Sequence, residues 1–159
     1  MATQKLCYPM AYVNISQGSN GKYSHKGVYA IDLCGEDYRA SDVFAQGNGT
    51  VIAITDRSVT IRYDNVVGQS GTVYKHLDVQ YYHETANEGI KVGQKLERGQ
   101  VFMKEGKKGK ATGNHIHVSC VGTFSNGKTA KLMPERMFTF NTTYNNFCRN
   151  VSVEPVRFF

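Results

Sequence analysis

The sequence predicts a mainly β protein of antiparallel sheet, with one short helix near the C-terminus. The chain has 159 residues, a length that suits a single domain spanning 1–159 with one hydrophobic core. It contains 16 glycines, 10 tyrosines and 8 phenylalanines but only 3 prolines, which is typical of strands joined by turns. Short runs of alternating or β-branched residues recur along the chain, and turn residues separate them.

Each predicted element follows from its own pattern. The residues 55–58, "TDRS", separate two of the runs so closely that these should form a hairpin. A helix is expected over Pro134–Phe138, because proline is favoured in the first turn of a helix. The polar and aromatic C-terminal segment is compatible with a closing strand. The runs that predict strands are residues 28–33, 50–55, 58–64, 71–77, 99–104 and 114–120.

The overall charge and the cysteines limit the classes of function. A net charge of +6 favours acidic partners such as nucleic acid, anionic membranes or bacterial wall polymers. No basic-aromatic motif of a nucleic-acid module occurs, so that alternative rests on charge and aromatic content alone. No apolar run reaches the roughly 20 residues of a membrane helix. Two disulfides and four buried thiols both remain open for Cys7, Cys34, Cys120 and Cys148.

Two alternating histidines lie in the segment "NHIHVSC", residues 114–120. Residues i and i+2 of a strand share a face, so His115, His117 and Ser119 should face one side while the apolar residues between them face the core. A metal ion is the usual reason to hold two imidazoles side by side. The alternative is a half-exposed strand that happens to carry histidine.

Other segments supply further candidate ligands. Asp32 lies between two apolar residues, and a carboxylate in such a strand needs an arginine, backbone donors or a metal as its partner. His25 lies seven residues earlier, and His76 ends another apolar strand, where a surface location is the alternative. Two histidines, one carboxylate and a water make an open zinc site, which activates water and polarises a carbonyl. Two spare histidines could then move protons, whereas His83 is expected at the surface.

Four segments, in this order, resemble the lysostaphin-type zinc endopeptidases, which cut peptide cross-bridges or stems of bacterial peptidoglycan. They read "ISQGSNGKYSHKGVYAID", "VFAQGNGTVIAI", "TVYKHLD" and "IKVGQKLERGQVFMKEGKKGKATGNHIHVSC". The resemblance covers roughly residues 15–120. It implies a lysostaphin-type fold, in which an antiparallel sheet carries a long substrate groove walled partly by the glycine loop 106–113. Residues 121–159 would form an extension that packs on this domain.

The resemblance also implies roles for individual residues. It makes His25, Asp32 and His117 the zinc ligands, and His76 and His115 the catalytic histidines that do not bind the metal.

Two departures from the family pattern concern the metal site. Six residues separate His25 from Asp32, where common members have three, and Asn114 stands where proline is common. Cys34 follows Asp32 by two residues, and a thiolate near zinc would compete as a ligand.

The function implied by the resemblance is that of a zinc-dependent peptidoglycan endopeptidase. No secretory signal is visible, which implies a phage lysin or a virion-associated lysin domain acting at the bacterial cell wall. The chain would act as a monomer or as part of a larger phage protein. A catalytically inactive relative that serves as a structural or wall-binding module is the alternative, although all five candidate positions are kept. The bond that is cut, in a glycine-rich cross-bridge or a D-alanyl stem link, stays open.

Overall fold

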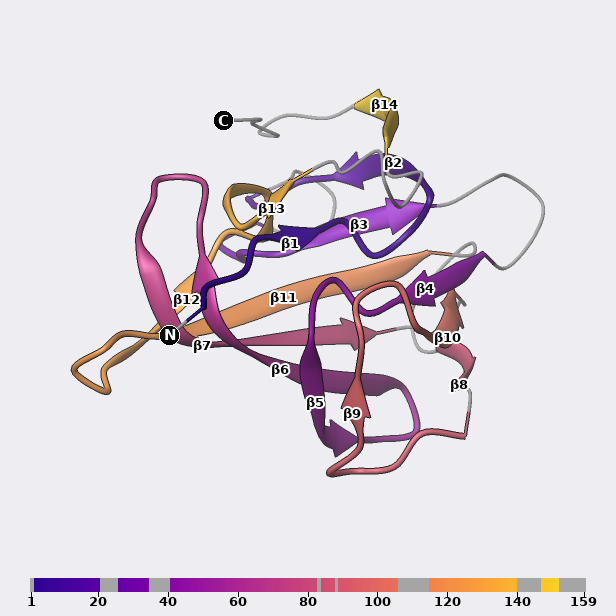
Figure 1. Cartoon of the computed structure of the whole chain (residues 1–159). Helices are drawn as coiled ribbons and strands as arrows, with labels where there is room; N and C mark the ends of the chain where they lie inside the picture. Colours follow the sequence, from indigo (N-terminus) through magenta and orange to yellow (C-terminus); the bar gives the residue numbers. More distant parts are fainter. Residues whose placement is uncertain are drawn as a thin grey trace.

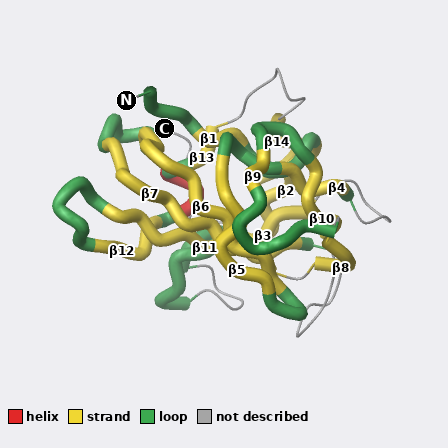
Figure 2. Tube along the Cα trace, turned by 60° about the horizontal axis from the view of Figure 1, so that its bottom comes forward, coloured by secondary structure: helices red, strands yellow, loops and turns green. Residues whose placement is uncertain are grey.

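The computed structural model describes residues 2–20, 26–34, 41–82, 84–87, 89–105, 115–139 and 147–151. In these ranges the regular secondary structure is almost entirely β-strand with mostly antiparallel pairing, which confirms the predicted fold class (Figures 1 and 2). The single helix there is η1 (Pro134–Arg136), a 3-10 turn two residues shorter than predicted, because Phe138 joins a strand. No helix in the described ranges is long and apolar enough to cross a membrane.

The main sheet has nine strands. Its order is β14-β2-β3-β11-β7-β6-β5-β9, with β12 paired to the second half of β11 (Figure 1). Neighbours run antiparallel except β14 and β2, which run parallel. The strands are β2 (Tyr12–Gln17), β3 (Ile31–Cys34), β5 (Gly49–Ile54), β6 (Ser58–Val67), β7 (Val73–Tyr82), β9 (Lys95–Leu96), β11 (Ile116–Thr123), β12 (Thr129–Leu132) and β14 (Phe147–Val151).

Two smaller sheets complete the described structure. One is antiparallel and has the order β4-β10-β8, formed by Asp42–Phe44, Val101–Glu105 and Glu84–Asn87. The other pairs β1 (Leu6–Cys7) with β13 (Phe138–Thr139) in parallel. The N-terminal segment is therefore tied to the segment that follows η1.

The strand predictions hold with one consequential difference. The hairpin expected at "TDRS" is the β5–β6 pair, and a C-terminal strand exists as β14. The strand predicted over 71–77 is β7, which continues five residues further, to Tyr82. It continues because the alternation does: Leu77, Val79 and Tyr81 are fully buried, while the residues between them are only partly buried.

The central strands have one buried face and one polar face. The buried residues of β6, β7 and β11 form most of the core with β3 and β10. Cross-strand pairs point to the same side of a sheet, so the register defines an opposite, outer face. On this outer face lie Asp32, Arg62, Asp64, His76, Asp78, Gln80, Tyr82, His117, Ser119, Val121 and Lys131.

A closed polar network lies inside the core. The hydroxyls of Tyr63 and Tyr81 lie 2.7 Å apart, the Gln46 N–H donates to the Tyr63 hydroxyl, and the Tyr81 hydroxyl donates to the Gln46 side-chain carbonyl. The Gln46 amide in turn donates to the carbonyl of Cys7. Burial raises the pKa of both tyrosines, which keeps their hydroxyls protonated. The network satisfies the polar atoms of Gln46, of Tyr63 in β6 and of Tyr81 in β7, which would otherwise be buried unpaired.

Replacing Tyr81 with phenylalanine should lower the free energy of unfolding by about 1–3 kcal/mol, because the Gln46 carbonyl and the Tyr63 hydroxyl lose their partner in the core. Tyr74→Phe is a matched control, since the Tyr74 hydroxyl makes no hydrogen bond within the described part of the chain. Urea denaturation measures both variants. Equal losses in the two would contradict the role of the network.

Two of the four cysteines have a defined state. Cys7 and Cys120 are free thiols, both buried. Burial raises the pKa of Cys7 to about 11, and it also raises the pKa of Cys120. For these two, the alternative of buried free thiols is confirmed. The side chains of Cys34 and Cys148 lie outside the described part of the structure.

Candidate functional site

Asp32 and His117 meet on the outer face of the main sheet. The antiparallel register of β3 and β11 places them directly opposite each other. Asp32 Oδ1 lies 3.1 Å from His117 Nδ1, and the two side chains are 13% and 24% exposed. Ile31 and Leu33 are fully buried on the other face, as the alternation predicted. The carboxylate therefore has an imidazole as its partner in a partly desolvated position.

Tyr82 flanks His117 from the neighbouring strand. The β7–β11 register pairs the two residues, and their rings meet edge to face with centroids 5.7 Å apart. Such an aromatic contact restricts the rotation of the imidazole. His115 stands two residues before His117 and is half-buried, on the same side of the strand by alternation.

His25 lies outside the described residues, but the chain on both sides of it is described. The Asn20 N–H donates to the carbonyl of Val28 at 2.9 Å, which closes the connection between β2 and β3 at its base. Asn20 has a φ of 60°, a left-handed value that asparagine tolerates better than most residues. The segment after His25, Gly27 to Tyr29, lines the same pocket as His117.

A buried glutamate anchors the start of this connection. Glu135 in η1 is 1% exposed, and its carboxylate accepts hydrogen bonds from the Ser19 N–H at 2.9 Å and from the Ser19 hydroxyl at 2.6 Å. These residues are 116 positions apart in the chain. The extension after residue 120 thus fixes the segment that leads to His25.

Glu135→Ala should lower the free energy of unfolding by about 1–3 kcal/mol, since it leaves the buried N–H and hydroxyl of Ser19 without an acceptor. Glu135→Gln keeps one acceptor oxygen and should cost less. Urea titrations of both variants beside the wild type give the comparison. A Gln variant that is less stable than the Ala variant would speak against the proposed hydrogen bonds.

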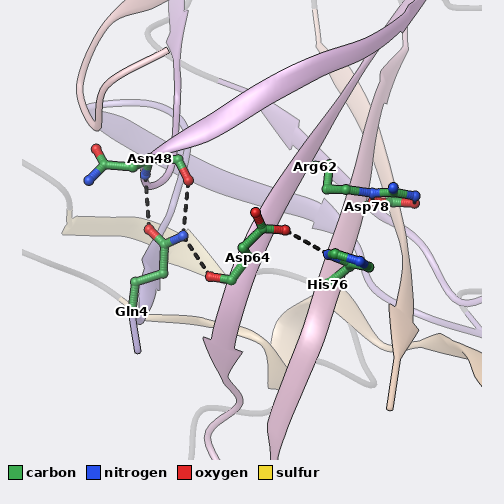
Figure 3. Close-up of polar contacts among 6 residues, drawn as sticks. All are labelled: Gln4, Asn48, Arg62, Asp64, His76 and Asp78. Atoms are coloured by element: carbon green, nitrogen blue, oxygen red, sulfur yellow. Dashed lines mark hydrogen bonds and ion pairs between the residues drawn. The ribbon is translucent and has the colours of Figure 1, made fainter. Parts of the chain in front are cut away.

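The structure does not bring His76 to Asp32 and His117. The register pairs His76 with Thr123, six positions along β11 from His117, which corresponds to about 20 Å at roughly 3.3 Å per residue. His76 Nδ1 instead lies 2.6 Å from Asp64 Oδ1 of β6 (Figure 3). At about 20 Å along the strand, the imidazole of His76 cannot reach a group bound by His117. The position of His76 therefore does not support its expected catalytic role.

The surroundings of His76 are a paired polar surface. Arg62 donates two hydrogen bonds to Asp78, at 2.8 and 2.9 Å, beside the Asp64–His76 pair (Figure 3). Gln4 bridges the backbones of Asn48 and Asp64 with its side-chain amide, which holds the N-terminal segment against β5 and β6 (Figure 3). The polar groups at this end of the outer face therefore bind one another and hold neighbouring segments together.

An open pocket of about 650 Å³ lies beside His117. Its floor is formed by the outer face of β7 and β11, and its walls are completed by the segment 27–29 before β3 and by Lys131 of β12. Three of its polar side chains, Gln80, Ser119 and Lys131, were not predicted as functional. The signal available in the sequence was the alternation of "VQYY", which carries β7 past Leu77 and brings Gln80 beside Ser119. The lining residues are Gly27, Val28, Tyr29, Gln80, Tyr82, His117, Ser119, Cys120, Val121 and Lys131.

The described residues gather two of the predicted metal ligands but not three. No group of three or more His, Cys, Asp or Glu side chains suited to a metal ion occurs among them. A metal site built on Asp32 and His117 would need a third protein ligand from outside the described residues, where His25 and the glycine loop 106–113 lie.

Comparison with known proteins gives curated relatives, among them a phage protein, and a consistent set of folds. No family model matches the chain. Morphogenesis protein 1 of Bacillus phage B103 is 32% identical over 117 residues, which are 72% of this chain but 31% of that protein. The chain thus spans less than a third of the length of this relative.

Solved structures share the fold at low sequence identity. A zinc containing peptidase from Vibrio cholerae has a TM-score of 0.59 at 21% identity, over 82% of this chain and 40% of that one. The antimicrobial peptidase lysostaphin from Staphylococcus simulans has a TM-score of 0.56 at 20% identity, over 85% and 54%. The SpoIIQ–SpoIIIAH pore forming complex gives 0.56 at 18% identity, over 86% and 92%. The chain has the lysostaphin-type peptidase fold.

Proposed function

We propose that this chain is a zinc endopeptidase domain of the lysostaphin type that hydrolyses peptide bonds of bacterial peptidoglycan. The observation that carries the proposal is the pairing of Asp32 with His117 on adjacent strands of this fold, with 3.1 Å between Oδ1 and Nδ1. Solved structures of the same fold that are described as a zinc containing peptidase and as lysostaphin support it.

The donor atoms fit a zinc ion. Two ligand atoms bound to tetrahedral zinc at about 2.0–2.1 Å stand about 3.3 Å apart, close to the observed separation of Oδ1 and Nδ1. We propose His25 as the third ligand, because Asn20 and Val28 close the connection that carries it and Gly27 lines the pocket of His117. The ion would activate water and polarise the scissile carbonyl.

The remaining histidines would handle protons. We propose that His115, on the same strand side as His117, accepts or returns the proton of the attacking water. For the second proton-handling group we propose His83 in place of His76. The support is that β7 ends at Tyr82, which pairs with His117, so that His83 is the first residue after the strand at this end of the sheet. His83 itself lies outside the described residues.

The biological setting is proposed from the phage relative. Similarity to Morphogenesis protein 1 of Bacillus phage B103 supports a phage setting. We propose that the chain acts in that setting as a lysin domain at the bacterial cell wall. Because the chain spans 31% of that protein, it would be one part of a larger phage protein. Pairing of β12, β13 and β14 with β11, β1 and β2 supports our inference that residues 121–159 belong to the same domain.

A second candidate function is a non-catalytic module that binds a partner or the cell wall. It is favoured by one observation, the likeness to the SpoIIQ–SpoIIIAH complex, over 92% of the chain compared. The two functions differ in whether a bond is broken.

Incubation of the purified protein with peptidoglycan sacculi tests the proposal. We expect new amino groups to appear, their release to stop after removal of metal with a chelator, and zinc to restore it. Sacculi that bind the protein but gain no amino groups in the presence of zinc would favour the non-catalytic module. Release that continues after exhaustive chelation would contradict the role of zinc.

A further inference from the structure

The pocket beside His117 runs along three cross-strand pairs that share the outer face of the sheet, at every second position of β11. Tyr82 pairs with His117, Gln80 pairs with Ser119, and Lys131 of β12 pairs with Val121. From His117 to Val121 the strand advances four residues, about 13 Å at roughly 3.3 Å per residue. The pocket is therefore long enough for about four residues of an extended peptide leading away from the candidate metal ligands.

Three polar side chains of this pocket are unpaired within the described part of the chain. Gln80, Ser119 and Lys131 make no side-chain hydrogen bond or ion pair with any part of the chain that the structure describes. Further along the same face the polar groups are paired to one another, Arg62 with Asp78 and Asp64 with His76. Three unpaired polar groups thus lie together where a ligand would lie, and a ligand can replace the water that solvates them.

The pocket also has exposed apolar walls. Five large hydrophobic residues in the described ranges are exposed, and three of them, Val28, Tyr29 and Val121, line this pocket at 38–42% exposure. Apolar walls with a few polar groups on the floor are typical of ligand sites. This combination suits a peptide with small aliphatic side chains.

The charge of the pocket indicates the charge of its ligand. Lys131 carries a formal positive charge, and no aspartate or glutamate occurs among the lining residues that the structure describes. Asp78 is the cross-strand neighbour of Val121, and Arg62 already binds its carboxylate with two hydrogen bonds. A ligand with a free carboxylate would supply the missing negative charge.

We propose that this pocket holds the wall peptide next to the bond that is cut, and that Lys131 binds a free carboxylate of that peptide while Gln80 and Ser119 bind its backbone. This inference rests on the proposed function. It implies that the substrate is an acidic stem peptide and not a neutral glycine-rich cross-bridge. Gln80, Ser119 and Lys131 are then specificity residues, because they contact the substrate away from the reacting atoms.

The test compares two synthetic stem-type peptides that differ only in whether the α-carboxyl of their γ-linked D-glutamate is free or amidated. Calorimetric binding and hydrolysis are measured for the wild type, Lys131→Gln and the control Lys95→Gln, an exposed lysine of β9 outside the pocket. We expect Lys131→Gln to weaken binding and raise KM roughly fivefold for the free acid alone, with kcat unchanged. Added salt should weaken binding of the free acid to the wild type.

The outcomes separate this inference from the function on which it rests. Preference for the free acid that depends on Lys131, without hydrolysis of either peptide, would support the pocket and contradict the endopeptidase. Hydrolysis with equal KM for the two peptides, or with the same KM in Lys131→Gln, would overturn the pocket and leave the endopeptidase standing. Faster cleavage of a pentaglycine peptide than of either stem peptide would also overturn it.

Discussion

Asp32→Asn should reduce zinc-dependent hydrolysis of peptidoglycan on the order of 10³-fold or more while the protein remains folded. The substitution keeps the shape of the side chain but removes the charge that faces Nδ1 of His117. Loss of the ion removes several kcal/mol of transition-state stabilisation, and each 1.4 kcal/mol is about a tenfold change in rate. Ile31 and Leu33, which anchor β3 in the core, are unchanged.

The control for this variant is Asp64→Asn, which removes the carboxylate paired with His76 on the same face of the sheet. Amino-group release from sacculi is measured for both, with urea denaturation to show that each is folded. Asp64→Asn should hydrolyse at nearly the wild-type rate. Comparable activity of Asp32→Asn and wild type would contradict the assignment of Asp32 as a ligand.

His83→Ala should reduce hydrolysis on the order of 10²- to 10⁴-fold, whereas His76→Ala should change it by less than about twofold. The reason is position: Tyr82, the residue before His83, pairs with His117, while His76 pairs with Thr123 at the other end of β11. Removing the partly exposed contact between His76 and Asp64 should cost no more than about 1 kcal/mol of stability.

Rates at saturating substrate and zinc content are measured together for the two histidine variants. Both should retain zinc, because neither residue is proposed as a ligand, so a lost rate in His83→Ala would report proton transfer. A large loss in His76→Ala with normal activity in His83→Ala would contradict this assignment and restore the role implied by the family resemblance.

Local patterns in the sequence were sufficient to predict which way the residues around Asp32 and His117 face. Alternation in "NHIHVSC" correctly placed Ile116, Val118 and Cys120 in the core and His117 on the opposite face. The apolar neighbours of Asp32 correctly indicated a carboxylate that needs a partner, but the imidazole of His117 beside it is none of the three kinds of partner expected. Both inferences depend only on the two-residue period of a strand.

Other parts of the site depend on long-range register, which local patterns do not contain. The strand predicted over 71–77 ended too early, so the sequence did not reveal that His76 and Tyr82 lie at opposite ends of one strand. Lys131 reaches the pocket only because β12 folds back onto the end of β11. The contact of Glu135 with Ser19 joins residues 116 positions apart. The roles of His25 and of the glycine loop 106–113 stay predictions, because both lie outside the described residues.

The zinc content of the protein purified without added metal, measured by elemental analysis, tests the central claim most directly. His117→Ala is measured beside it, with His76→Ala as a control that removes a histidine from the same face. The account predicts about one zinc ion per chain in the wild type and in His76→Ala, and none in His117→Ala. A wild type that does not bind zinc even when zinc is supplied, or equal zinc in His117→Ala, would contradict it.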